Sequence, residues 1–166
     1  MSINVSDMGL RVYPDPILKT KAEPFALPLP ENIVQIGEKM CEMMYDYEGI
    51  GLAGPQAGLS WRVIVFDLSE ERNEPTVLIN PEIIEMSKDK VKEEEGCLSF
   101  PEIHGYVVRH ESVKVQAINV KGEKVELEGS GLMAAMFQHE IDHLNGVTFV
   151  DRLGVTGKMK IRKMLQ

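Results

Sequence analysis

The sequence feature that most constrains the fold is an H-E-x-x-H pattern formed by His139, Glu140 and His143. Successive residues of an α-helix are rotated by about 100°, so histidines four positions apart lie within roughly 40° of each other on one face. Two imidazoles placed in this way can bind one metal ion. Glu140 falls beside that face, where a carboxylate can transfer protons close to the metal. The pattern therefore predicts a metal-binding helix with its own proton-transfer group.

The neighbouring residues predict where this helix begins and ends. Residues 132–144 contain neither proline nor glycine, Ser130 is positioned to cap the first turn, and Asn145 and Gly146 provide a stop. Apolar side chains lie on both the histidine face and the opposite face: Leu132, Ala135, Met136, Met133, Phe137, Ile141 and Leu144. A helix that is apolar on two sides is buried, so we expect the metal to lie inside the domain. The alternative is a core helix whose histidines are satisfied by hydrogen bonds.

The composition is that of one globular domain. With 166 residues, of which 43% are hydrophobic and 27% charged, we expect residues 1–166 to bury a single core. The formal net charge of −8 argues against general nucleic-acid binding, which needs a basic surface. The first residues lack the pattern of a signal peptide, and no segment reaches membrane-spanning length. We therefore expect a cytoplasmic protein that does not contact membranes.

A catalytic metal needs a third protein ligand and an open position for water or substrate. Downstream of His143 the sequence offers no histidine, cysteine or glutamate, and only Asp151 could supply a carboxylate. Upstream, Cys97 lies in a turn where a thiolate could be presented, and one thiolate with two imidazoles suits Zn or Fe(II). Cys41 lies in an apolar helical stretch and is expected to be a buried thiol.

Hydrophobic periodicity predicts an amphipathic helix over residues 32–47, and the basic tail over residues 158–163 predicts a short terminal helix. Six segments have the composition or alternation of β-strands: 61–68, 76–79, 82–86, 113–120, 124–128 and 147–150. The proline-containing residues 11–30 are expected to be irregular, and the charged residues 88–95 to form the solvated end of a hairpin. Residues 49–58 contain too much glycine for a long helix, but glycine lets a backbone approach a ligand closely.

Three short motifs follow one another along the chain. Residues 49–56 read G-I-G-L-A-G-P-Q, residues 95–99 read E-G-C-L-S, and residues 138–144 read Q-H-E-I-D-H-L. Together they resemble the motifs of the peptide deformylase family, and the similarity covers most of the chain. Gly54 departs from the family, in which alanine is frequent at this position, and we expect it to change loop stiffness more than chemistry.

The resemblance implies an α+β fold, with mostly antiparallel strands surrounding a central metal-binding helix, an N-terminal amphipathic helix and a short C-terminal helix. It implies a hydrolase of protein biosynthesis that removes the formyl group from the N-terminal N-formylmethionine of newly synthesised polypeptides and releases formate. The cofactor of the family is one divalent metal ion, usually Fe(II) in bacterial cells and Zn, Ni or Co in other preparations. Similar tails are thought to contact the ribosome near the exit tunnel, although a solvated helix face is the preferred interpretation of Lys158, Lys160, Arg162 and Lys163.

Carried over position by position, the resemblance implies roles for individual residues. The metal ligands would be Cys97, His139 and His143. Glu140 would be the general base and acid, and the Gln56 side chain and the Leu98 N–H would donate hydrogen bonds to the formyl oxygen. Gly49 and Gly51 would let the peptide backbone lie against the loop as an added strand. An apolar slot for a methionine-like side chain would be lined by Ile50, Leu132, Ala135 and Met136, although core packing explains the same residues.

Other residues and other functions remain open at this level. Glu48, Arg109 and Asp142 are candidates for orienting the loop and the ligands, whereas His104 and His110 have no motif partner and are treated as ordinary polar residues. An endopeptidase would use the same helix to cleave internal peptide bonds, with Cys97 as an unusual third ligand, and the lack of a downstream ligand counts against it. A non-catalytic module would need a closed site with four protein ligands, and the sequence offers three good ones.

Overall fold

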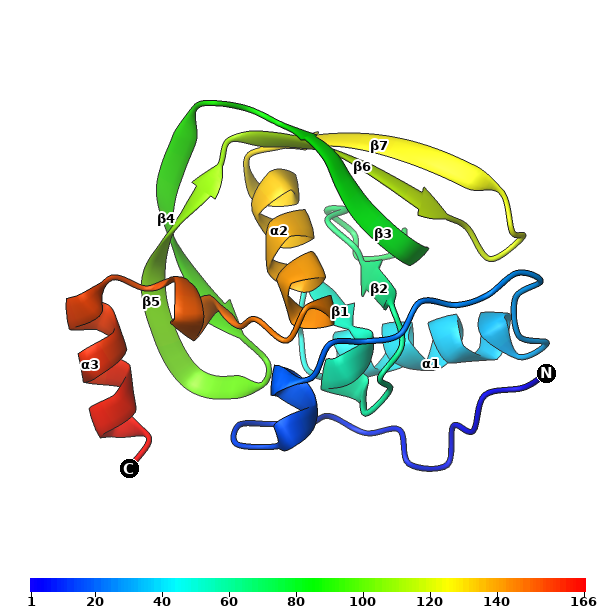
Figure 1. Cartoon of the computed structure of the whole chain (residues 1–166), viewed down its shortest axis with the longest axis horizontal. Helices are drawn as coiled ribbons and strands as arrows, with labels where there is room; N and C mark the ends of the chain where they lie inside the picture. The colour runs from blue at the N-terminus through cyan, green and yellow to red at the C-terminus, as the bar shows by residue number, and fades with distance from the viewer.

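The computed structural model describes residues 1–166 and has the predicted α+β architecture (Figure 1). The helices are α1 (Ile33–Asp46), α2 (Leu132–Leu144) and α3 (Val155–Met164), with short 3-10 helices η1 (Pro16–Lys19), η2 (Gly54–Ala57) and η3 (Phe149–Arg152). The strands are β1 (Gly51–Ala53), β2 (Val63–Phe66), β3 (Thr76–Met86), β4 (Lys90–Cys97), β5 (Phe100–His110), β6 (Ser112–Ile118) and β7 (Lys124–Ser130).

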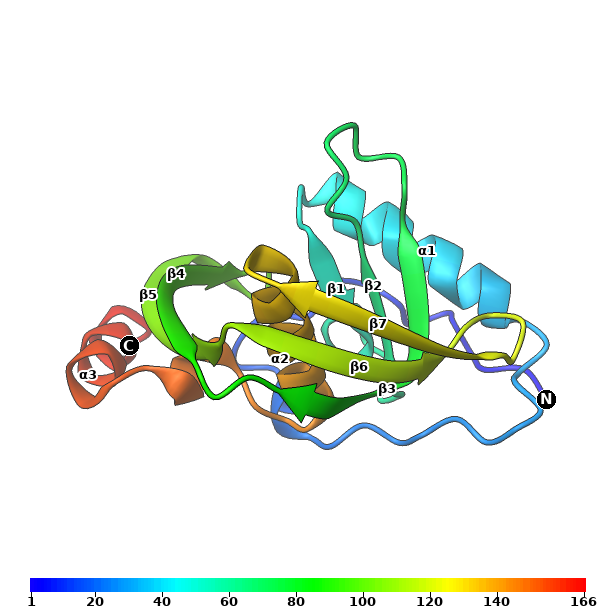
Figure 2. The same cartoon turned by 90° about the horizontal axis from the view of Figure 1, so that it is seen from above.

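The strands form two antiparallel sheets. Five of them make a sheet with the order β1-β2-β3-β6-β7, and β4 pairs with β5 in a separate hairpin. Helix α2 lies in the middle of the molecule, with the large sheet on one side and the hairpin on another (Figure 1). Helix α1 lies across the end of the sheet that carries β1 and β2, as Figure 2 shows from above.

The large sheet is buried on both faces around β2, whose residues alternate between two cores. Ile64 and Phe66 pack with α2 residues such as Phe137, whereas Val63 and Val65 pack with α1 residues such as Met40. This alternation follows from the two-residue repeat of a strand. Phe137 is fully buried, and truncating such a side chain to alanine typically costs about 3–5 kcal/mol. The core therefore fixes α2 firmly against the sheet.

A third, smaller core joins the β4–β5 hairpin to the C-terminal segment. Its buried members come from β5, η3, α3 and the turn between the last two: Phe100, Ile103, Val107, Phe149, Leu153 and Ile161. Figure 1 shows α3 lying beside the hairpin, away from α1 and the large sheet. None of the helices is both long and apolar enough to cross a membrane.

The predictions for α1, α2 and α3 are confirmed to within a few residues, but the predicted cap of α2 is wrong. Gly131, with φ of 58°, occupies the N-cap position, and no side chain accepts a hydrogen bond there. The positive φ places the chain in a conformation that glycine adopts without strain. Ser130 is instead the last residue of β7 and pairs with Ser112.

The strand predicted over residues 147–150 is also wrong. The side chain of Asp151 accepts hydrogen bonds from the Thr148 N–H at 2.9 Å and from its hydroxyl at 3.2 Å. These bonds close the chain into η3 instead of leaving it extended. Three further segments differ from prediction. Residues 90–97 form β4 instead of a hairpin end, and β5 was not predicted at all. The strands predicted over residues 76–79 and 82–86 are one strand, β3, with an irregular register between Ile79 and Glu82.

Candidate metal centre

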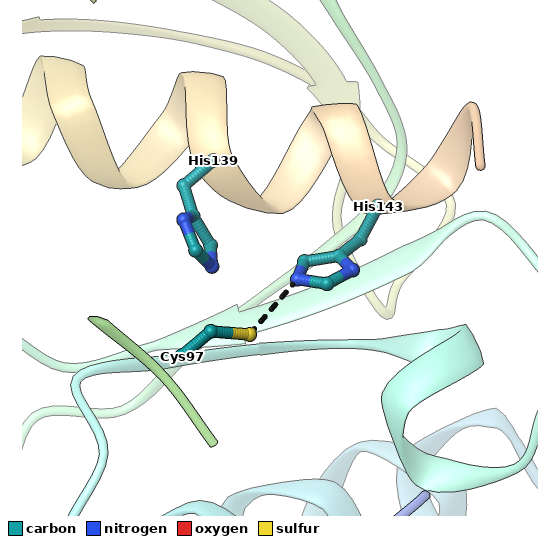
Figure 3. Close-up of side chains that lie close together, drawn as sticks. All are labelled: Cys97, His139 and His143. Atoms are coloured by element: carbon teal, nitrogen blue, oxygen red, sulfur yellow. Dashed lines mark hydrogen bonds between the residues drawn. The ribbon is translucent and has the colours of Figure 1, made fainter. Parts of the chain in front are cut away.

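Three side chains from two distant parts of the chain meet beside α2. His139 and His143 project from the same side of the helix towards Cys97, the last residue of β4 (Figure 3). One ligand atom from each residue lies within 4.8 Å of the other two. The Cys97 Sγ is 3.3 Å from Nε2 of His143. A thiolate and two imidazoles gathered at this spacing form a donor set that suits a divalent transition metal.

The surroundings of the two histidines set the protonation of their rings. His139 Nδ1 lies 3.0 Å from Oε1 of Glu95, so a proton on Nδ1 leaves Nε2 free as a ligand atom. Burial lowers the pKa of His139, but Glu140, Cys97 and Glu95 outweigh it and raise this pKa well above its usual value, so a metal ion would have to displace a proton from His139. His143 is fully buried. Burial and the positive charges of His139 and Arg109 lower the pKa of His143 well below its usual value. A histidine must be neutral to bind a metal, so this low pKa favours the ligand form.

The carboxylate of Glu95 is itself held by a buried arginine. Arg109 donates two hydrogen bonds to Glu95, at 2.8 and 2.9 Å, and a third to Asp142 at 2.7 Å. Burial raises the pKa of Glu95, but the bonds from Arg109 and His139 outweigh it and lower the pKa to about 2. Arg109 and Asp142 thus lie where they can orient His139. Glu48, the third residue considered for such a role, is exposed at the rim of the pocket.

Glu140 lies beside the three candidate ligands and is almost completely buried. Its Oε1 has no hydrogen-bond partner among the protein atoms. Burial raises the pKa of Glu140 to about 7, which suits a group that must both accept and release a proton near neutral pH. Gly51 is packed closely against it, since a Cβ atom there would lie 2.6 Å from Oε2 of Glu140.

The side chain of Gln56 has a fixed orientation at the same site. Its Oε1 accepts a hydrogen bond from the Ala53 N–H at 2.9 Å, so Nε2 must point the other way. Nε2 lies 3.4 Å from the Cys97 Sγ and 3.3 Å from the Ser99 hydroxyl. A hydrogen-bond donor is therefore aimed at the candidate metal centre. Leu98, the other predicted donor, lines the same pocket.

A pocket of about 450 Å³ opens directly onto Glu140 and His139. Its walls include all six residues expected to contact a peptide: Gly49, Ile50, Gly51, Leu132, Ala135 and Met136. Leu132 is 63% exposed, so it lies at the mouth instead of deep in the slot. Sequence reasoning missed the β5 contribution to the pocket: Phe100, Pro101, Glu102, Ile103 and His104. A strand prediction over these residues would have placed them next to Cys97.

His110 and Gln138 form hydrogen bonds that connect α2 to the end of β5. The Gln138 side chain accepts a hydrogen bond from the His110 N–H at 3.0 Å and donates one to the His110 carbonyl oxygen at 2.9 Å. His110 Nδ1 contacts the Ser87 carbonyl oxygen at 2.7 Å. Gln138 therefore fastens α2 to the end of β5, which helps to hold the histidines at a constant distance from the hairpin.

Comparison with known proteins gives a consistent result. The model of the polypeptide deformylase family matches residues 8–158. A peptide deformylase from Thermotoga maritima is 45% identical over 156 residues, covering 94% of this chain and 93% of that protein. One from Neisseria gonorrhoeae is 47% identical over 159 residues, covering 96% and 94%. The crystal structure of a peptide deformylase from Legionella pneumophila superimposes with a TM-score of 0.88 at 39% identity, covering 96% and 94%. The chain therefore belongs to the polypeptide deformylase family.

Proposed function

We propose that this deformylase hydrolyses the formyl amide of N-formylmethionine at the start of newly synthesised polypeptides and releases formate. The observation that carries the proposal is the meeting of Cys97, His139 and His143 around one point, with Glu140 beside them in an open pocket. Membership of the family supports the same reaction. The chemistry of the site supports it independently, because amide hydrolysis needs an activated water and a proton-transfer group.

We propose Cys97, His139 and His143 as the ligands of one divalent metal ion, with Fe(II) as the native metal. The thiolate and the two imidazoles also suit Zn, Ni and Co. A metal in this site supplies Lewis acidity, which makes water a better nucleophile at neutral pH. No fourth side chain joins these three within the cluster, and the pocket reaches His139 and Cys97. This arrangement fits an open catalytic site better than a closed structural one.

Glu140 is proposed to carry the proton through the reaction. It takes a proton from the attacking water as the new C–O bond forms at the formyl carbon. It then gives this proton to the departing nitrogen as the C–N bond breaks, so that a neutral amine and formic acid are formed. The formic acid loses its remaining proton to solvent and becomes formate. A pKa of about 7 lets one carboxyl group perform both steps near neutral pH.

Gln56 and Leu98 are proposed to stabilise the negative charge that develops on the formyl oxygen. The fixed direction of the Gln56 Nε2 supports this role, because a donor that is already oriented needs no rearrangement during the reaction. The backbone N–H of Leu98, next to Cys97 in the sequence, would be the second donor. Removing one such donor typically slows a reaction about a hundredfold or more.

The pocket supports selection of a methionine-like side chain. Ile50, Leu132, Ala135 and Met136 provide apolar surface, and Gly49 and Gly51 leave room for a peptide backbone. A missing methylene in such a slot typically costs only about 1–3 kcal/mol, so we expect preference for methionine and not absolute selection.

We further propose that residues 1–166 act as one catalytic domain in the cytoplasm, with formylmethionyl peptides as the substrate. The exposed positive charges on α3 include Lys160, Arg162 and Lys163, and they support contact with the ribosome near the exit tunnel. The net charge of −8 supports neither general nucleic-acid binding nor attachment to an anionic membrane surface.

The deciding experiment incubates anaerobically prepared, Fe(II)-loaded protein with a formyl-Met tripeptide and measures formate. We expect rapid release of formate, much slower hydrolysis of the acetyl-Met tripeptide, and inhibition by a hydroxamate that binds metals. A longer peptide without a formyl group is the control for endopeptidase activity. Cleavage of its internal bonds without formate release from the first substrate would contradict the proposal.

A further inference from the structure

Residues 48–51, called here the rim segment, join α1 to β1 and form one side of the pocket. They lie tightly against the catalytic groups. A Cβ atom at Gly49 would be 2.7 Å from Leu98 Cδ1, and one at Gly51 would be 2.6 Å from Oε2 of Glu140. Since reacting groups must be placed to within a fraction of an ångström, a small shift of this segment would change the site.

The rim segment is held from behind by the connection between β2 and β3. The Asp67 N–H donates to the carbonyl oxygen of Ile50 at 2.9 Å. The guanidinium of Arg72 donates to the carbonyl oxygens of both Gly49 and Asp67, so it bridges the two segments. Figure 2 shows this connection beside the end of α1 and the beginning of β1.

Arg72 and Asp67 are in turn held by side chains that do not line the pocket. The fully buried Asp67 carboxylate accepts hydrogen bonds from the Tyr45 hydroxyl at 2.5 Å, from the Ser69 N–H and hydroxyl at 2.8 and 2.6 Å, and from the Glu74 N–H at 3.1 Å. The Arg72 guanidinium lies over the Tyr45 ring, 5.4 Å from its centroid. No buried side-chain nitrogen or oxygen of the cluster lacks a hydrogen-bond partner, which favours a rigid arrangement.

We propose that Arg72 is a positioning residue for substrate binding, and that together with Tyr45 and Asp67 it holds the rim segment at a fixed distance from α2. These three residues are called the clasp. The inference rests on the proposed function, because it assigns the clasp to the binding of a formylated peptide along Gly49 and Gly51. The planar guanidinium binds two carbonyl oxygens at once through two different nitrogens. A lysine ammonium has a single nitrogen and cannot reproduce this geometry.

The test compares Arg72→Ala with the unchanged protein on a formyl-Met tripeptide. Loss of one charged bridge to the backbone is expected to raise KM about tenfold, with kcat changed by less than about threefold. Formyl-Met amide, which has no further residues to lie along the rim segment, should show a smaller change in KM. Arg72→Lys should be intermediate, and Tyr45→Phe, which keeps the ring but loses the hydroxyl, should raise KM by only about twofold.

A second readout separates positioning from a general loss of stability. Hydrogen exchange of the amides in the rim segment should be faster in Arg72→Ala, while exchange in α2 stays the same. Glu71→Ala is the matched control, because Glu71 is the exposed neighbour of Arg72. An unchanged KM in an active Arg72→Ala enzyme, or unchanged exchange of the rim segment, overturns the proposal. If the unchanged protein releases no formate, the proposed function fails, and the exchange experiment still decides whether the clasp holds the segment.

Discussion

The two sides of the pocket are held in place in different ways. Helix α2 satisfies its own backbone hydrogen bonds and is fixed by buried apolar contacts, including those of Phe137 and Leu144. The rim segment opposite is short and rich in glycine, and two of its carbonyl oxygens are bound by groups from another loop. In the proposed function the helix carries the chemistry, whereas the rim segment sets how the substrate lies against it. Substitutions on the two sides should therefore affect different kinetic constants.

The largest effect is expected on the helix side, from Glu140→Ala. Loss of the proposed proton carrier should lower kcat by about a thousandfold or more, with little change in bound metal, because Glu140 is not among the three proposed ligands. The measurements are formate release and metal content of the same preparation. Activity within tenfold of the unchanged enzyme would remove Glu140 from the mechanism.

Gln56→Ala tests a donor that comes from neither side and should have the next largest effect. We expect kcat to fall about a hundredfold with a smaller change in KM, because the hydrogen bond is strongest when charge develops on the formyl oxygen. Ser99→Ala is the control, since its hydroxyl contacts only the Nε2 of Gln56 among side chains. A rise in KM alone, with kcat unchanged, would argue for a role in substrate binding.

Gly51→Ala sharpens the comparison because it acts where the two sides touch. The added methyl group would meet Oε2 of Glu140 at 2.6 Å, so the carboxylate or the rim segment must move. We expect kcat/KM to decrease roughly tenfold, with most of the loss in kcat if Glu140 moves. Gly9→Ala is a matched control, since a Cβ atom there has no neighbour within 4 Å. Equal activity of the two variants would show that the contact is easily relieved.

The smallest effect concerns the stability of the clasp against acid. Burial raises the pKa of Asp67, but hydrogen bonds from Ser69, Tyr45 and Glu74 outweigh it and lower the pKa well below the usual 3.8. The resulting stabilisation is complete above pH 3.8 and is lost as the pH falls towards the lower pKa of the folded state. The midpoint of thermal unfolding should thus fall more steeply below pH 3.8 in the unchanged protein than in Asp67→Asn. Parallel curves would contradict this assignment.

The local sequence was sufficient to predict the helix on one side of the pocket. The predicted bounds of α2 agree with the structure, because the apolar periodicity and the Asn145-Gly146 stop act within a few residues. The structure also brings Cys97 next to the two histidines, as expected from the lack of a downstream ligand. The fold class is confirmed.

The rim side could not be predicted in the same way. Arg72 of the clasp binds the backbone carbonyl oxygens of Gly49 and Asp67. Every residue has such a carbonyl group, so the sequence does not indicate which ones are bound. Strand β5 was missed because Pro101 and Gly105 interrupt its sequence. The strand is also irregular, since Glu102 has φ of 64°. Pairing with β4 compensates for these unfavourable residues, and such pairing depends on contacts that a local pattern does not contain.

Phe100 and Ile103 have neighbours in two parts of the molecule. They line the pocket, and they also pack against Leu153 and Ile161 in the core formed with the C-terminal segment. A chain that stopped before Gly154 would keep Phe149 and Leu153 but lose Ile161, the buried side chain that α3 contributes to this core. Helix α3 therefore supports the β5 side of the proposed substrate pocket, and we expect its removal to weaken peptide binding even when a short peptide is assayed without ribosomes.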